Sequence, residues 1–142
     1  MTRYERLIDE IDNSDIELLE TDSLVVPAHS VCVDGECCIA FNESAFVTTA
    51  ERHVALAHEK AHCETGSFYT FNSPLLTYEV NEAKAWRKTI GDAMTFKELS
   101  AELPKHIYAD GLDIYDLAEH FNLPAEFMKK VLDHHCQEGE RW

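Results

Sequence analysis

Residues 54–64 read Val54-Ala55-Leu56-Ala57-His58-Glu59-Lys60-Ala61-His62-Cys63-Glu64 and contain the pattern H-E-x-x-H. On a helix, residues four apart lie one above the other, so His58 and His62 can offer imidazole nitrogens to one cation. Glu59 projects from a neighbouring face, where its carboxylate can take a proton from a water molecule that the cation holds. The pattern therefore predicts a metal site that activates water. For so short a pattern, the alternative is a surface helix with two solvated histidines.

The residues around this pattern predict a helix that carries both histidines close to the core. The segment Thr48-Thr49-Ala50-Glu51 has the form of a capping box, which starts helices. Apolar residues then recur at helical spacing, at Ala50, Val54, Ala57 and Ala61. Gly66 marks the end of the helix, because glycine tolerates the left-handed backbone conformation that terminates helices.

A catalytic zinc site has three protein ligands and one open position, so a third ligand is expected. Glu82 is a candidate on a second predicted helix, and Glu79, one turn earlier, is its rival. One face of that helix is predicted to pack inward and comprises Glu82, Ala85, Trp86, Thr89 and Ala93. For either glutamate the alternative is an exposed carboxylate, which is what most glutamates are.

Three segments carry a family resemblance: His58 to Tyr69, the pair Ser73-Pro74, and Glu82-x-x-Ala85 with the later Glu98-Leu99. In order and spacing they resemble the ImmA/IrrE family of metalloendopeptidases, especially members from phages and mobile elements of Gram-positive bacteria. The resemblance implies a zincin-like fold that binds Zn²⁺. It also implies that His58, His62 and Glu82 are the zinc ligands and Glu59 the general base, and its E-x-x-A spacing favours Glu82 over Glu79.

The chain also departs from the pattern of that family in two places. Ala61 stands where the family often has glycine, and alanine is small enough for the same close packing. The segment Ala93-Met94-Thr95 replaces a usual Leu-Ile-Pro, so the end of the helix that carries Glu82 is expected to differ.

The remaining sequence predicts an α+β fold. A helix is expected over residues 2–12 and a short strand over residues 16–19. Asp34-Gly35 suits a type I′ turn between strands at 31–33 and 36–41. In zincins a small antiparallel sheet packs beside the helix that carries the two histidines, and its edge strand can pair with an extended substrate. The alternative is that the sheet is only scaffold. We expect a zincin-like metallopeptidase domain over residues 1–104 and a C-terminal helical pair over residues 105–142, packed on the same domain.

The segment between the two ligand helices, residues 66–74, is rich in aromatic and turn residues. Beside a metal it is placed to line a substrate groove, and Tyr69 is a candidate catalytic donor to the oxyanion that forms when a carbonyl is attacked. The alternative is that its aromatic side chains only cover the core.

Composition limits the choice of partners. The formal net charge of −15 disfavours nucleic acid and anionic membrane surfaces as partners, and no apolar run is long enough to span a bilayer. The predicted helices at 113–121 and 125–136 have the shape of a helix-turn-helix but are too acidic to bind DNA. With no secretory signal at the N-terminus, a cytosolic location is expected. The five cysteines share no C-x-x-C spacing, so reduced thiols are expected.

These observations together predict a cytoplasmic, zinc-dependent endopeptidase. The family resemblance implies that its substrate is a protein, a helix-turn-helix transcriptional repressor of a phage or mobile element. One alternative is a non-catalytic acidic antirepressor or adaptor that binds a repressor without cutting it. Another is a zinc hydrolase that acts on a small amide, although the aromatic segment and a possible open edge strand suit an extended chain better.

Overall fold

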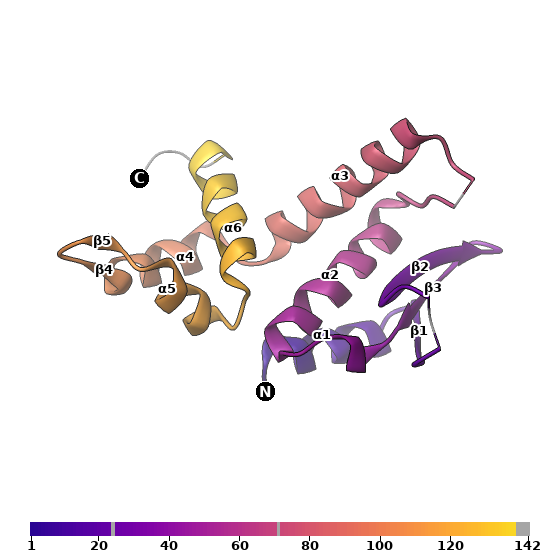
Figure 1. The fold of residues 1–142 in the computed structure, drawn as a ribbon, viewed down its shortest axis with the longest axis horizontal. Coiled ribbons are helices and arrows are strands. Elements are labelled where there is room, and N and C mark those ends of the chain that lie inside the picture. Colours follow the sequence, from indigo (N-terminus) through magenta and orange to yellow (C-terminus); the bar gives the residue numbers. More distant parts are fainter. Residues whose placement is uncertain (24, 71, 139–142) are drawn as a thin grey trace. The chain divides into compact units, whose positions relative to one another are not determined.

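The structure is a computed structural model that describes residues 1–23, 25–70 and 72–138. The chain divides into two compact units, residues 1–89 and 90–142 (Figure 1). The helix α3 begins in the first unit and ends just inside the second. None of the described helices is both long enough and apolar enough to cross a membrane.

The first unit combines helices with one small sheet, which confirms the α+β class. Its elements are α1 (Arg3–Asp12), β1 (Glu17–Glu20), β2 (Ala28–Val33), β3 (Glu36–Phe41), the 3-10 helix η1 (Glu43–Ala45), α2 (Thr49–Thr65) and α3 (Leu75–Asp92). Buried side chains from α1, β3 and α2 form its core: Tyr4, Leu7, Ile11, Ile39, Phe41 and Leu56.

The sheet has the strand order β1-β3-β2, with β3 in the centre. The predicted hairpin is confirmed, because Asp34 and Gly35 have φ angles of 53° and 81° and join antiparallel β2 and β3. The prediction of an antiparallel sheet is confirmed for β2 and β3 but is wrong for β1, which pairs parallel with β3 from Glu17 opposite Cys38 to Glu20 opposite Phe41. Strand β2 separates β1 from β3 in the chain and runs antiparallel to β3. The chain therefore reverses direction twice between β1 and β3, so these two strands run parallel.

The helix α2 has the ends that the sequence predicts. The Thr48 side chain accepts a hydrogen bond from the backbone N–H of Glu51, and Gly66 ends the helix in the left-handed conformation with φ 67°. Strand β2 packs beside α2 (Figure 1), so the sheet lies against the helix that carries both histidines. This arrangement confirms the predicted packing of the sheet on that helix.

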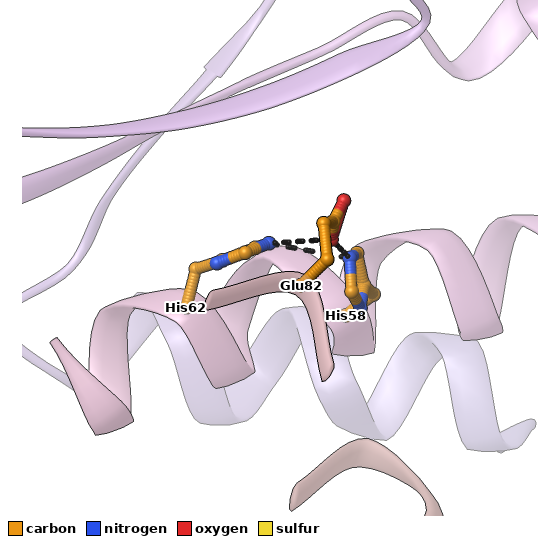
Figure 2. Close-up of side chains that lie close together, drawn as sticks. All are labelled: His58, His62 and Glu82. Atoms are coloured by element: carbon orange, nitrogen blue, oxygen red, sulfur yellow. Dashed lines mark hydrogen bonds and ion pairs between the residues drawn. The ribbon is translucent and has the colours of Figure 1, made fainter. Parts of the chain in front are cut away.

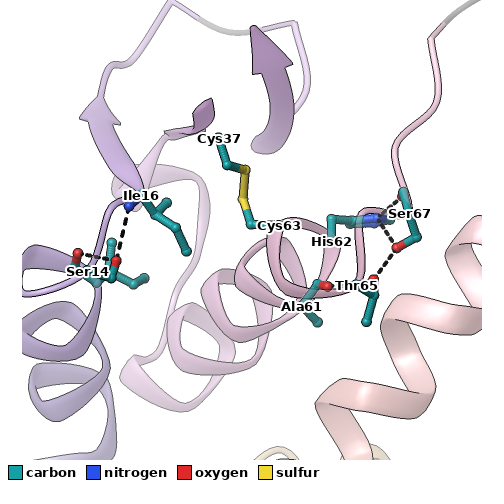
Figure 3. The surroundings of a disulfide bond; sticks show 9 residues. Ser14, Ile16, Cys37, Ala61, His62, Cys63, Thr65 and Ser67 are labelled. Atoms are coloured by element: carbon teal, nitrogen blue, oxygen red, sulfur yellow. Dashed lines mark hydrogen bonds between the residues drawn. A yellow bond between two sulfur atoms is a disulfide. The ribbon is translucent and has the colours of Figure 1, made fainter. Parts of the chain in front are cut away.

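A disulfide bond between Cys37 of β3 and Cys63 of α2 links the sheet to this helix (Figure 3). The expectation of reduced thiols is therefore wrong for these two residues. Spacing in the sequence shows no pairing motif, but packing of α2 on the sheet brings the two Cα atoms to 5.8 Å, within the range that a disulfide spans. As expected from helix geometry, Cys63 is turned away from the histidine beside it.

The second unit is mostly helical. Its elements are α4 (Phe96–Glu102), the 3-10 helix η2 (Leu103–His106), β4 (Ile107–Tyr108), β5 (Gly111–Leu112), α5 (Ile114–Phe121) and α6 (Ala125–Glu138). The predicted pair of C-terminal helices is confirmed, with Asp113 capping α5 and Asn122 ending it at φ 54°. The short hairpin β4–β5 was not predicted. Residues 90–104, which the sequence prediction placed in the first domain, group with this unit.

Candidate metal centre

His58 and His62 lie one turn apart on α2 and direct their rings toward the same point (Figure 2). Both side chains are buried, with 6% and 3% of their surface exposed. Their Nε2 atoms are 3.2 Å apart, and the two rings meet edge to face. The structure therefore brings the two predicted histidine ligands together inside the first unit.

Glu82 reaches the two histidines from α3 (Figure 2). Its Oε2 atom lies 2.7 Å from Nε2 of His58 and 3.2 Å from Nε2 of His62. These three residues form a group whose possible ligand atoms all lie within 4.8 Å of one another. Glu79 is exposed and lies outside the group. The geometry thus selects Glu82 over Glu79, the choice that sequence spacing alone left open.

A hydrogen bond at Nδ1 of His62 shows which nitrogen of this ring carries a proton. Its Nδ1 atom lies 2.6 Å from the backbone carbonyl oxygen of Ser67, and because a carbonyl only accepts, Nδ1 must donate (Figure 3). In neutral His62 the Nε2 atom then bears a lone pair, which faces the carboxylate oxygen of Glu82. Two acceptors that face each other repel unless a proton or a metal cation lies between them. Histidines that bind metals commonly have this outer hydrogen bond.

His58 is held mainly by packing. Its ring stacks on Trp86 with centroids 3.9 Å apart and planes 24° from parallel. Its Nδ1 atom is buried and has no hydrogen-bond partner among the described residues. Burial lowers the pKa of His58, although Glu82 acts in the opposite direction, so the neutral ring that a metal requires is favoured.

The second carboxylate oxygen of Glu82 is also engaged. The hydroxyl of Tyr69 donates to Oε1 of Glu82 at 3.1 Å, and the Tyr69 ring meets the edge of the His62 ring at 5.7 Å. Burial alone would raise the pKa of Glu82, but His58, Tyr69 and His62 together lower it below the ordinary value. Tyr69 therefore lies in the site, where its hydroxyl orients a candidate ligand. Phe71, in the same segment, lies outside the described residues.

Glu59 lines a narrow crevice together with His62 and Tyr69, next to the three converging atoms. Burial raises its pKa, while hydrogen bonds from the side chain and the backbone N–H of Ser30 lower it. Ser30 is itself buried on β2, 6% exposed. No local pattern in the sequence identifies Ser30, because it meets Glu59 only after β2 has packed beside α2.

These contacts fit a zinc ion. Two imidazole nitrogens and one carboxylate oxygen, a donor set that zinc prefers, converge on one point. One histidine has an outer hydrogen bond to a carbonyl, and Glu82 has one from a tyrosine. A carboxylate that can accept a proton lines the adjoining crevice. The arrangement is that of a candidate metal site with a carboxylate beside it.

A second group in the other unit, Glu102, His106 and His120, also places its possible ligand atoms within 4.8 Å of one another. Nδ1 of His106 lies 2.7 Å from Asp116 and Nε2 lies 3.0 Å from Glu102, so both nitrogens donate to carboxylates. These bonds raise the pKa of His106 and stabilise its protonated form. The hydrogen bonds of His106 are therefore satisfied within an ion network, without a metal ion.

Searches against protein-family models, curated proteins and solved structures each gave no match.

Proposed function

We propose that the protein is a zinc-dependent endopeptidase. The observation that carries this proposal is the convergence of His58, His62 and Glu82 on one point, with Glu59 lining the crevice beside it. Zinc bound there would polarise a carbonyl group and lower the pKa of a water molecule toward 7. The proton-accepting carboxylate favours this function over a purely structural zinc site, which needs no such group.

Three side chains would transfer protons, orient the base and stabilise the oxyanion. Glu59 would accept the proton of the attacking water and later return it to the leaving amine. Ser30 would hold the Glu59 carboxylate in place through its two hydrogen bonds. Tyr69, whose hydroxyl donates to Glu82, would donate to the oxyanion of a bound substrate instead.

The resemblance of residues 44–99 to the ImmA/IrrE family supports a narrower proposal for the substrate. It would be a helix-turn-helix repressor of a phage or mobile element, cleaved in the cytoplasm. A protein substrate agrees with the open side of β2, which can pair with an extended chain.

Replacement of the proposed base tests the catalytic role. We expect Glu59→Gln to keep its zinc and to cleave unfolded protein at least about 100-fold more slowly, the range typical of a lost general base. Glu64→Gln, one of the exposed carboxylates on the same helix, is the matched control and should cleave normally. Zinc content and gel analysis of the products measure the two effects. A Glu59→Gln protein as active as the parent would refute the mechanism.

The net charge of −15 favours one rival, a non-catalytic acidic antirepressor that occupies the DNA-binding surface of a basic repressor. That function predicts release of a repressor from its operator with no new fragments. Release that is equally strong with Glu59→Gln would support the rival, whereas release that needs Glu59 would support cleavage.

A further inference from the structure

A cavity of about 520 Å³ lies beside the candidate metal centre in the first unit. Its lining is mainly apolar and aromatic and includes Val26, Ala28, His29, Tyr69, Leu75 and Tyr78. Its volume lies in the range of pockets that bind small molecules, so it has room for a large side chain. None of the described residues that line it is Asp, Glu, Lys or Arg, so a charged group would be desolvated there without a counter-ion.

This cavity adjoins the candidate metal centre. His29 and Tyr69 line both this cavity and the narrow crevice that contains Glu59 and His62. Tyr69 also contacts the candidate ligand Glu82. A carbonyl group at the metal centre would therefore place a neighbouring side chain of the same substrate at the mouth of the larger cavity.

The strand that borders the cavity can hold an extended chain. Within the described residues β2 pairs only with β3, so its other edge is open. Val33 and Glu36 flank the two-residue turn and form a hydrogen-bonded pair, and such pairs alternate along the ladder. Ala28, Ser30 and Cys32 therefore direct their backbone groups to the open edge, where the N–H of Ser30 already donates to Glu59. Added strands bind to such an edge through main-chain hydrogen bonds.

The rim of the cavity exposes apolar surface that a substrate would cover. Leu75 is 71% exposed and Tyr78 is 43% exposed at the start of α3. Exposed apolar groups next to a polar site commonly mark a binding groove. An incoming apolar side chain would bury its own surface and part of theirs.

We propose that this cavity is a specificity subsite that takes a large apolar side chain, such as Leu, Met or Phe. The side chain would belong to an extended peptide paired with the open edge of β2, at a residue next to the cleaved bond. The inference rests on the proposed endopeptidase function and adds the chemical class of the residue that the site selects. Burial of such a side chain favours it over alanine by about 10- to 150-fold in affinity.

Binding to a variant that cannot cleave tests the subsite separately from catalysis. The probe is a set of fluorescent ten-residue peptides, rich in Thr and Lys, that carry one guest residue at each position in turn. Their affinities for zinc-loaded Glu59→Gln are measured by fluorescence anisotropy. At one position, guests Leu and Phe should bind about 10- to 150-fold more tightly than Ala, and Asp should bind no better than Ala.

Filling the cavity should remove this preference. Ala28→Phe, made in the Glu59→Gln background, should reduce the advantage of Leu over Ala to less than about threefold, a loss of most of the burial term. Val33→Phe is the matched control on the same strand, at an exposed site outside the cavity, and should keep the preference. Leu75→Glu, on the exposed rim, provides a second variant if Ala28→Phe does not fold by circular dichroism.

The outcomes separate the subsite from the proposed function. The proposal of the subsite is refuted, and that of the endopeptidase is kept, if the parent cleaves peptides without an apolar preference. The same holds if the preference survives Ala28→Phe and Leu75→Glu. If no guest binds more tightly than alanine, the subsite is also wrong. If the preference is found and depends on the cavity but the parent cleaves none of the peptides, the subsite stands and the endopeptidase function is wrong.

Discussion

Nδ1 of His62 lies 2.6 Å from the backbone carbonyl oxygen of Ser67, five residues later in the chain. The bond depends on the left-handed turn at Gly66, with φ 67°, which directs the chain back toward the helix that it has just left. The imidazole is therefore oriented by the end of its own helix. Because the backbone orients this candidate ligand, the conformation of Gly66 is part of the candidate site.

Gly66→Ala should affect both stability and metal binding. Left-handed conformation costs a residue with a Cβ atom about 1–2 kcal/mol, although an added Cβ would meet no atom within 4 Å. Relaxation of the turn would displace the Ser67 carbonyl and weaken zinc binding by about 10- to 100-fold. Gly35→Ala, at φ 81° in the β2–β3 hairpin, should cost similar stability but leave zinc affinity unchanged. Equal zinc affinities in the two variants would contradict this account.

Zinc content should distinguish the two candidate carboxylates on α3. Protein purified without added zinc should carry about one equivalent of zinc, and Glu82→Ala should lose most of it. Loss of an outer hydrogen bond weakens metal affinity by about 10- to 100-fold, and loss of a ligand should weaken it more. Glu79→Ala should bind zinc like the parent. Elemental analysis and a chelator competition measure both. If the parent binds no zinc even when it is supplied, the three residues are not a zinc site.

The disulfide between Cys37 and Cys63 should stabilise the first unit. It closes a loop across a sequence separation of 26, for which the chain-entropy model gives about 3–4 kcal/mol. A dithiol reductant should lower the free energy of unfolding by that amount, and Cys37→Ser should remove the response. Cys32→Ser, at an exposed free cysteine, should respond like the parent. Urea unfolding with and without reductant makes the measurement, and an unchanged midpoint would exclude a stabilising bond.

The ion network of the second unit should be visible in its pH dependence. Hydrogen bonds to Asp116 and Glu102 raise the pKa of His106, and bonds from Tyr108 and His106 lower that of Asp116. His106 therefore stabilises the fold fully below its ordinary pKa of 6.5. This stabilisation is lost as pH rises through the raised pKa. Asp116 stabilises the fold fully above its ordinary pKa of 3.8. This stabilisation is lost as pH falls through the lowered pKa. The network should stabilise most between these limits.

An NMR titration checks the direction of these shifts. The His106 ring should titrate above 6.5, and Asp116→Asn should move its pKa downward. Asp133→Asn, at an exposed position on α6, is the control and should leave His106 unchanged. A His106 pKa at or below 6.5 in the parent would show that the network does not form.

Local signals explain which features the sequence predicts. Thr48 and Gly66 bound α2, and both act on neighbouring residues alone. The turn at Asp34-Gly35 needs two residues that tolerate positive φ. Helical spacing placed Glu82 on the inward face of α3, where the structure has it beside the histidines. Each of these predictions depends on contacts within a few residues of the chain.

The features that were missed depend on contacts between distant segments. The parallel pairing of β1 with β3 follows from the strand order, which no residue of β1 encodes. Cys37 and Cys63 meet only after α2 packs on the sheet, and Ser30 meets Glu59 for the same reason. The hairpin β4–β5 has two residues in each strand, too few to show an alternating pattern.

The open edge of β2 also bears on how the protein behaves at high concentration. An unpaired edge strand is a template on which a second copy of the same chain can add, so it promotes aggregation. The net charge of −15 opposes such encounters, because two copies repel each other over about 10 Å at moderate ionic strength. Salt at about 1 M shortens that range to about 3 Å. Concentrated stocks should therefore stay monodisperse in dilute buffer and begin to self-associate as salt is added.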